Sequence, residues 1–395
     1  MSRTVLDIHI LQNVPPSNIN RDDTGSPKTA VYGGVQRSRV SSQAWKRATR
    51  EKFQEDLAPE ELAVRTKKVA EYVAERILEH DGNMAQESAW DLAAKVIKAA
   101  TGATVEVPDR KKKKAKEEGY DGPVAPESKY LMFLSRRQRD ALGDLAYEGK
   151  EDITAFLKDK DVKKRAKDLA DTAHSIDIAL FGRMVADGAD VNVDAATQVA
   201  HALSVHEVDN ESDYYTAVDD RTPDEETGAG MIGTVDFNSA TLYRYAAVDV
   251  DHLAKTLGKG MRDDQPGSEP VRRAVEAFVR GFVESMPSGK ANTFGNHTLP
   301  EAVVVKVRSA RPISFIGAFE KPVTSTHDSG YMEEAVRRLT THAERIEAAY
   351  GDDDAQGWAM SVSGHPVSGL GDEVGGLKEL VTLVGEAVAQ RRGTS

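Results

Sequence analysis

The sequence predicts an α+β fold in which a strand-rich domain is interrupted twice. Alternation of apolar and polar residues predicts strands over residues 4–13 and 35–42, and again over residues 233–249. Between these segments, residues 59–173 have the spacing of three and four residues between apolar side chains that is typical of helices. Residues 191–232 combine apolar pairs with a polar, acidic tip, and we expect them to form a projecting hairpin.

The first segment, residues 1–58, is expected to contain two strands, a loop and a helix. Residues 13–25 are rich in proline, asparagine and glycine, which predicts a loop after the first strand. Either Ser41 or Ser42 can cap a helix, because a serine hydroxyl accepts a hydrogen bond from an unpaired backbone amide. We therefore expect a helix over residues 43–55.

The helical block contains two strongly basic stretches. Residues 109–122 are dominated by lysine and have low complexity, which predicts an exposed, mobile loop. Residues 158–167 place a second basic patch on a helix, and such patches are most often only solvated. A short strand is expected over residues 130–135, and residues 174–190 are expected to return to the strand-rich domain as a further strand.

The residues after the hairpin complete the strand-rich domain. They predict, in order, one strand, an amphipathic helix, a pair of strands and two closing helices, over residues 233–249, 268–286, 301–323, 330–350 and 375–391. The resulting division of the chain has five segments, which are 1–58, 59–173, 174–190, 191–232 and 233–395.

Composition excludes several classes of protein. The chain of 395 residues has no cysteine, which removes disulfides, thiolate zinc sites and cysteine nucleophiles. It has neither an apolar run long enough to span a membrane nor a signal-peptide pattern, so a cytoplasmic protein is expected. The net charge is −12, yet the first 50 residues hold eight Lys or Arg against three acidic residues. One basic face on an acidic body would confine a polyanion to one path.

The basic residues of this face concentrate in residues 16–50. On the expected helix, four side chains that can donate hydrogen bonds share one stripe, and they are Gln43, Lys46, Arg47 and Arg50. Trp45 and Phe53 can face the core on the opposite side. Such a stripe predicts contacts to the phosphate groups of a nucleic acid, although a solvated basic face has the same pattern.

Common catalytic patterns are absent from the sequence. The ten histidines do not cluster, and no HEXXH, Walker or GXSXG motif is present. Asp22 and Asp23 offer two carboxylates that could hold a metal ion for phosphodiester cleavage. Beside Arg21 and Lys28 they are better explained as turn and salt-bridge groups. We expect no catalytic residue, no bound metal and no cofactor, and keep a metal-dependent RNA nuclease as the alternative function.

Side chains that stack on bases or wedge between them are the second requirement for binding a single-stranded nucleic acid. Met184 lies after a glycine at the end of a predicted strand, and Tyr214 and Tyr215 lie in the predicted hairpin. From the residues alone, ordinary packing explains these three side chains equally well.

The run NINRDDTGSPKTAVYGGVQRSRVSSQAWKRATR, residues 18–50, closely resembles the N-terminal motif of the CasC-type backbone subunits of the type I-E CRISPR Cascade complex. The resemblance continues through DIALFGRM at 177–184, VAHALSVHEVDNESDYYTAVDD at 199–220 and GTVDFNSATLYRYA at 233–246, and through the later segments KANTF and AFEKPV. It spans the chain and is weakest over residues 59–173.

The resemblance implies an RRM-like (ferredoxin-like) palm, a helical finger insertion and a β-hairpin thumb. The palm would comprise residues 1–58, 174–190 and 233–395, the finger 59–173 and the thumb 191–232. Subunits of this kind are not enzymes; several copies stack along the spacer of one CRISPR RNA and present it for pairing with target DNA in antiviral defence. The implied partners are the CRISPR RNA guide, the target DNA strand, other copies of the chain, other Cascade subunits and a nuclease-helicase recruited to the ribonucleoprotein, with no membrane.

The resemblance also implies which residues contact RNA. The stripe on the expected helix would contact the guide backbone, Met184 would insert beside a displaced base, and Tyr215 would act from the thumb. Tyr215 stands where phenylalanine is more frequent, and Asn292, close to Lys290, stands where some relatives have arginine. The full set of expected RNA-binding residues is Asn20, Arg21, Lys28, Arg37, Ser41, Gln43, Lys46, Arg47, Arg50, Arg183, Met184, Tyr215, Thr216 and Lys290.

Overall fold

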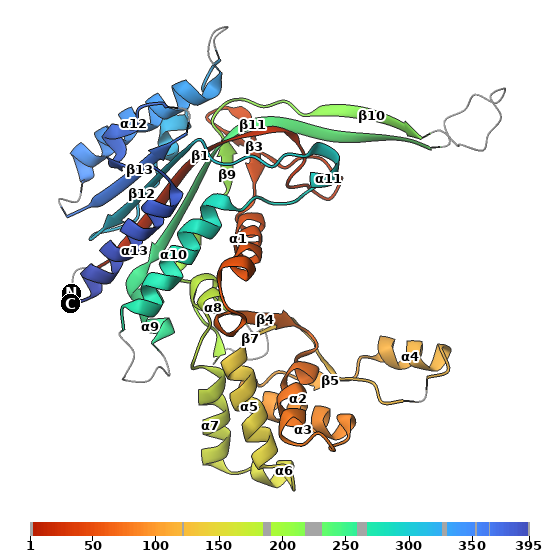
Figure 1. Ribbon diagram of the computed structural model, residues 1–395. Coiled ribbons are helices and arrows are strands. Elements are labelled where there is room, and N and C mark those ends of the chain that lie inside the picture. The colour runs from red at the N-terminus through yellow and green to blue at the C-terminus, as the bar shows by residue number, and fades with distance from the viewer. Residues whose placement is uncertain are drawn as a thin grey trace, which may run out of the picture. The chain divides into compact units, whose positions relative to one another are not determined.

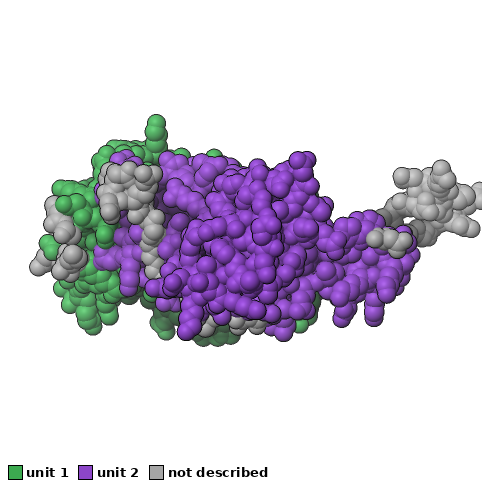
Figure 2. All heavy atoms as spheres, turned by 90° about the horizontal axis from the view of Figure 1, so that it is seen from below, with its two compact units in different colours: residues 1–55, 197–250, 275–395 green, residues 56–196, 251–274 purple. Residues whose placement is uncertain are grey.

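The computed structural model has the expected α+β class and contains two compact units. Unit 1 consists of residues 1–55, 197–250 and 275–395, and unit 2 of residues 56–196 and 251–274 (Figure 2). The described residues are 3–120, 122–184, 191–217, 231–258, 267–325, 330–351, 354–362 and 364–393. Because 218–230 fall outside these ranges, the expected acidic tip of the hairpin is not described.

Within the described residues, unit 1 is built on a ten-stranded sheet (Figure 1). The strand order is β14 (Asp372–Glu373), β13 (Gln356–Ser361), β12 (Ala302–Arg308), β1 (Val5–Ser17), β11 (Met231–Asp249), β9 (Ala202–Ser204), β3 (Val35–Val40) and β2 (Thr29–Tyr32). Two further strands, β8 (Thr197–Val199) and β10 (Glu211–Ala217), pair with β11. The pairing of β13 with β14 is parallel, whereas β1 pairs antiparallel with both β11 and β12.

The core of unit 1 lies on the central strands. Leu11 of β1 and Val304 of β12 share a buried apolar cluster with Leu339 of α12 (Tyr331–Tyr350). Helix α13 (Leu377–Gly393) packs on β12 and β13, and Figure 1 shows it in front of the sheet. Helices on the sheet explain why β1 is buried on both faces from Val5 through Gln12.

The other helices of unit 1 follow the strands closely. Their bounds are α1 (Ser42–Asp56), α10 (Glu269–Glu284, in unit 1 from residue 275), α11 (Ala291–Phe294), η3 (Ile316–Phe319) and η4 (Ser368–Leu370). The predicted capping serines place the start of α1 correctly, and its buried side chains include Trp45 and Phe53. The prediction of a helix over 43–55 with these two residues facing inward is therefore confirmed.

Unit 2 is mainly helical. Its helices are η1 (Pro59–Glu61), α2 (Val69–His80), α3 (Gln86–Thr101), α4 (Asp109–Glu117), α5 (Arg136–Glu148), α6 (Ile153–Phe156), α7 (Lys160–Ala170), α8 (Ile176–Phe181) and α9 (Val250–Leu257). Two small sheets pair β4 (Ala63–Thr66) with β7 (Met132–Ser135) and β5 (Val105–Glu106) with β6 (Glu127–Ser128). Val73, Ala93 and Leu142 lie at the centre of one apolar cluster.

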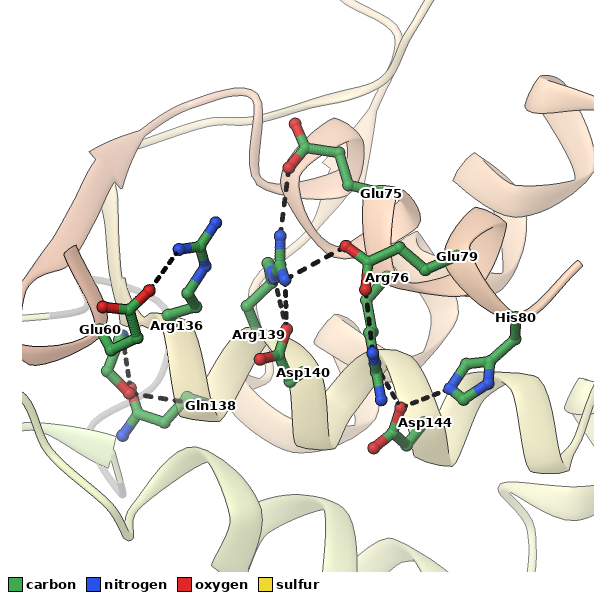
Figure 3. Close-up of polar contacts among 11 residues, drawn as sticks. Glu60, Glu75, Arg76, Glu79, His80, Arg136, Gln138, Arg139, Asp140 and Asp144 are labelled. Atoms are coloured by element: carbon green, nitrogen blue, oxygen red, sulfur yellow. Dashed lines mark hydrogen bonds and ion pairs between the residues drawn. The ribbon is translucent and has the colours of Figure 1, made fainter. Parts of the chain in front are cut away.

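Ion pairs tie α2 to α5 on the surface of unit 2 (Figure 3). Asp144 accepts hydrogen bonds from Arg76 Nε at 2.7 Å and lies 2.6 Å from His80 Nε2. The side chain of Arg139 is only 6% exposed and pairs with carboxylates on both helices, including Asp140 and Glu79. The cations of this face are thus neutralised within unit 2.

Three sequence-based expectations about elements are wrong. Residues 109–117 form helix α4 rather than a loop, since buried Glu127 of β6 pairs with Arg110 and Lys111 in its first turn. Residues 176–181 form α8 rather than a strand, because a short apolar run fits either state. Within 301–323 only β12 is a strand, and the second segment contains the short helix η3.

Candidate nucleic-acid interface

The loop before β2 is held in one shape by its own polar side chains. Asn18 is fully buried, and its Nδ2 donates to the carbonyl oxygens of Gly25 and Asp236, each at 2.8 Å. Asp22 Oδ1 accepts hydrogen bonds from the Thr24 amide, the Thr24 hydroxyl and the Ser26 amide at 2.9, 2.7 and 3.0 Å. These bonds, first that from the Thr24 hydroxyl, lower the pKa of Asp22. The loop is therefore an ordered platform.

Helix α1 begins on this loop. Asn20 Oδ1 accepts a hydrogen bond from the Ser41 amide at 2.9 Å, and Ser41 Oγ accepts one from the Ala44 amide at 3.4 Å. Ser41 therefore caps α1, and its hydroxyl is already used in the isolated chain. Gln43 and Arg47 follow on the exposed side of the helix.

A third segment, residues 287–290, packs against the same loop from a distant part of the sequence. A Cβ on Gly289 would lie 2.4 Å from the carbonyl oxygen of Ile19, so only glycine permits this approach. Lys290 follows with a left-handed φ of 47°, and the ring of Phe294 lies 5.8 Å from that of Phe237 on β11. The position of Lys290 is thus fixed from both sides.

These three segments line a hollow of about 810 Å³ in unit 1. It brings together six of the expected RNA-binding residues, which are Asn20, Arg21, Ser41, Gln43, Arg47 and Lys290. Carboxylates line it as well: Asp22, Asp23 and Glu51. The hollow therefore has mixed charge and rich hydrogen-bonding capacity, which suits a phosphate backbone with its 2′-hydroxyls better than a bare anion.

Two cations of α1 differ in their surroundings. Arg47 Nε lies 2.8 Å from Glu51 Oε1, and the side chain of Arg47 is 82% exposed. Lys46 is half-buried and makes no ion pair with any described residue, and burial lowers its pKa. A desolvated ammonium without a counter-charge is stabilised when a phosphate approaches it.

Lys28 lies beside a second basic group. Its backbone is fixed by hydrogen bonds between the Lys28 amide and the Asn20 carbonyl and between the Arg39 amide and the Lys28 carbonyl, both at 2.9 Å. Arg39 also lies 3.1 Å from His201 Nδ1. Burial, then Arg39 and Lys28, lower the pKa of His201. This histidine is thus a neutral member of a basic cluster that the sequence did not single out.

Arg37 occupies a different environment from the one expected of an RNA contact. It is fully buried, and its guanidinium donates to the carbonyl oxygens of Tyr32, Ser204 and Phe319 at 3.1, 3.1 and 2.9 Å. These bonds tie β3 to segments far along the chain. An RNA contact by Arg37 would require them to break, so the structure assigns this residue to the fold.

Unit 2 holds the two expected residues at the end of α8, and they differ sharply. Arg183 is 4% exposed, with hydrogen bonds to the carbonyl oxygens of Val191 at 2.9 Å and Ala170 at 2.8 Å. Arg183, like Arg37, therefore has a structural role. Met184 is 82% exposed, as an inserting side chain requires, and it follows Gly182, which ends α8 with a φ of 78°.

The β10–β11 hairpin carries the expected thumb residues. Tyr215 pairs across the ladder with Gly233, and a Cβ on Gly233 would lie 2.4 Å from the tyrosine ring, so the ring covers that glycine. Tyr214 alternates to the other face and is 59% exposed, against 44% for Tyr215. Thr216 is exposed and shares the face of Tyr214.

The base of this hairpin is clamped by a residue that the sequence did not indicate. Asp236 accepts hydrogen bonds from Ser212 Oγ at 2.6 Å and from Ser26 Oγ at 2.5 Å, and these bonds, first that from Ser212, lower the pKa of Asp236. Ser26 belongs to the loop before β2 and Ser212 to β10. Nothing in the spacing of residues 26, 212 and 236 could have revealed this contact, because it depends on the folded sheet.

Comparison with known proteins places these observations in context. A family model described as CT1975-like protein matches residues 6–383. A solved chain described as "CRISPR RNA-guided surveillance complex, pre-nicking" is 32% identical with a TM-score of 0.80, covering 97% of this chain and 100% of that one. Another, described as "CRISPR RNA-guided surveillance complex", is 29% identical with a TM-score of 0.70, covering 97% and 99%. A search of curated proteins found no match.

Proposed function

The chain belongs to the CT1975-like protein family, and we propose that it is a non-catalytic subunit that binds CRISPR RNA in a Cascade surveillance complex of type I-E. Several copies would assemble along the guide spacer and present it to target DNA. In this proposal residues 59–173, within unit 2, form the helical finger and the β10–β11 hairpin belongs to the thumb. Most of the RRM-like palm lies in unit 1, although residues 174–184, expected in the palm, group with unit 2.

One observation carries the proposal. Three segments far apart in sequence, the loop at 18–25, the start of α1 and residues 287–290, converge on one hollow lined by hydrogen-bond donors. Similarity over nearly the whole chain to two chains described as parts of RNA-guided surveillance complexes supports RNA as its ligand.

The chemistry of the hollow fits a ligand of variable sequence. A guide differs from one spacer to the next, so a subunit that repeats along it should contact backbone and leave base recognition to pairing. Lysine, arginine, serine and glutamine donors serve this purpose without a base-specific pocket. Met184 and Tyr215, both exposed, supply side chains that could displace or stack on single bases.

The arrangement of Asp22 supports a non-catalytic role. Its Oδ1 holds the loop through three hydrogen bonds, so metal binding there would compete with the turn. Among the described residues, no group of three or more His, Asp or Glu side chains could hold a metal ion. No helix in the described ranges is long and apolar enough to cross a membrane.

The experiment is a double charge reversal on α1, Lys46→Asp with Arg50→Asp. Each lost phosphate contact lowers affinity and also the slope of log affinity against log salt by about one. We expect the double variant to lose RNA on purification and to fail to form oligomers, while circular dichroism reports a folded chain.

A matched control reverses two exposed lysines of unit 2, Lys163→Asp with Lys164→Asp, which changes the net charge equally. Full assembly of the α1 variant on RNA would contradict the assignment of the stripe. Equal loss in the control would show that bulk charge, and not the interface, retains RNA. Cleavage of labelled RNA with Mg²⁺ that Asp22→Ala abolishes would instead identify a nuclease.

A further inference from the structure

A buried arginine lies directly beneath the helix that carries the phosphate-facing stripe. Arg244 of β11 is fully buried, and its guanidinium carbon lies 3.7 Å from the ring centroid of Trp45 on α1. The ring of Phe282 on α10 lies 4.7 Å away. Trp45 is buried on the inner side of α1, whereas Gln43 and Arg47, each two positions from it, are exposed, so the charge of Arg244 and these residues of the stripe lie on opposite sides of one helix.

Arg244 has no carboxylate partner in the described part of the chain. Its Nη1 donates to Gln12 Oε1 at 2.6 Å and its Nη2 to the carbonyl oxygen of Phe282. Its Nε is buried and makes no hydrogen bond with any described group. The guanidinium is therefore held only by neutral groups.

Arg308, in the same unit, is a buried arginine whose charge is compensated by carboxylates. It is also fully buried, and its Nε lies 2.6 Å from Asp7 Oδ2 and its Nη2 2.6 Å from Glu347 Oε1. A buried cation is costly unless paired. Arg308 meets this requirement through two carboxylates, and Arg244 does not.

Arg244 nevertheless remains a cation at neutral pH. Burial lowers its pKa to about 9, which is still well above 7. Its two aromatic neighbours stabilise the charge through their ring faces. The positive charge is thus permanent under ordinary conditions and lies in a region of low dielectric.

We propose that Arg244 is a positioning residue of the nucleic-acid interface, a buried cation whose counter-charge is the phosphate backbone bound across α1. This inference rests on the proposed RNA-binding function and adds a residue that touches no RNA. Through Trp45 it holds α1 in place, and its charge adds to the attractive potential on the outer side of the helix.

The expected size of the effect follows from the thickness of a helix. A helix with its side chains is about 10–12 Å across, so a phosphate bound to the stripe would lie at about that distance or slightly more from the guanidinium. At the effective dielectric constant of about 20 that applies near protein surfaces, removing one charge at about 12 Å lowers affinity about tenfold, and screening by salt and water reduces the expected effect to about three- to tenfold. Water between the charges makes the lower end the more realistic expectation.

The test compares Arg244→Met, which keeps the length of the side chain, with Arg244→Lys, which keeps the charge. Each purified full-length variant would be titrated with a 20-nucleotide single-stranded RNA at several salt concentrations, and its unfolding midpoint measured. We expect Arg244→Met to bind three- to tenfold more weakly at low salt, with a salt slope that falls by clearly less than one because no direct phosphate contact is lost. We expect Arg244→Lys to recover most of the affinity.

Lys46→Met is the matched comparison, since removing a direct contact should lower the salt slope by about one. Affinity of Arg244→Met equal to that of the wild type would overturn the inference and leave the proposed function intact. If Arg244→Met does not fold, Arg244→Lys decides alone: a folded lysine variant with strongly weakened RNA binding would overturn the role proposed for the charge, and one that binds as the wild type does would support it. Failure of the wild type to bind RNA would overturn the proposed function itself.

Discussion

Lys46 of α1 in unit 1 and the arginines that join α2 to α5 in unit 2 have opposite electrostatic surroundings. On α2 and α5, Arg76 and Arg139 each meet carboxylates of the neighbouring helix, as Figure 3 shows. On α1, Lys46 is half-buried and has no carboxylate among the described residues. A paired cation contributes to the stability of its own unit. A partly buried cation without a carboxylate partner lowers the free energy of unfolding and remains available to bind a polyanion.

The largest expected effect is on the free energy of unfolding. It follows from a change in the loop at residues 287–290, which lines the hollow together with α1. Gly289→Ala places a Cβ 2.4 Å from the Ile19 carbonyl oxygen, and the backbone must shift to accept it. We expect unfolding free energy to fall by about 2 kcal/mol, as for other overpacked sites. RNA affinity should fall as well, because Lys290 moves with the loop. Urea unfolding and RNA titration measure the two effects.

Gly376→Ala is the control, since its Cβ would meet no atom within 4 Å. Similar losses in both variants would mean that the close approach at Gly289 does not position the interface.

A smaller loss of unfolding free energy is expected when a paired cation of unit 2 is removed. Arg139→Met removes a charge that is 6% exposed, together with its ion pairs to Asp140 and Glu79, of which Glu79 keeps Arg76. The expected loss is about 1.5 kcal/mol of unfolding free energy, typical of hydrogen bonds to charged groups. RNA affinity should not change. Arg165→Met removes a half-exposed partner of Glu148 and should cost much less. A marked loss of RNA binding in Arg139→Met would contradict the distinction between cations that are paired within the fold and cations that are available to RNA.

The smallest expected effect is on the pH dependence of the unfolding free energy. The charged form of Asp144 in unit 2 stabilises the folded state, whereas the charged form of Lys46 in unit 1 destabilises it. Burial raises the pKa of Asp144, but hydrogen bonds from Arg76 and His80 outweigh it, and the net pKa is lowered. A carboxyl whose pKa is lowered by folding stabilises the folded state at pH values above its ordinary pKa. This contribution is lost as the pH falls through the pKa of the folded state. For Lys46, burial lowers the pKa, so its charge destabilises the free protein below the folded value and that penalty disappears above about 10.5.

The measurement is the urea midpoint between pH 7 and pH 3. The wild type should lose about 0.5 kcal/mol more than Asp144→Asn over this range, a size typical of exposed pairs. Parallel curves for the two proteins would show that the Asp144 pairs contribute nothing measurable.

Much of the candidate site could be predicted because its signals are local. Ser41 caps α1, and the spacing of Gln43 and Arg47 puts both on its outer side, as helical periodicity requires. Arg37 and Arg183 carry the same charge in equally suggestive motifs, yet both are buried among carbonyl oxygens. Sequence shows that an arginine is present, but it does not show whether folding places backbone acceptors around it.

By itself the sequence determined the α+β class, the strands over residues 4–13, 35–42 and 233–249, the helix after Ser41 and the concentration of positive charge near the N-terminus. These depend on periodicity and on neighbours within one or two turns. Only the tertiary structure decided that Gly289 lets residues 287–290 close the hollow. It also decided that Arg244 lies under Trp45 with no carboxylate among the described residues, while Arg308 is paired. Both depend on segments more than 190 residues apart meeting in space, and such contacts leave no local pattern in the chain.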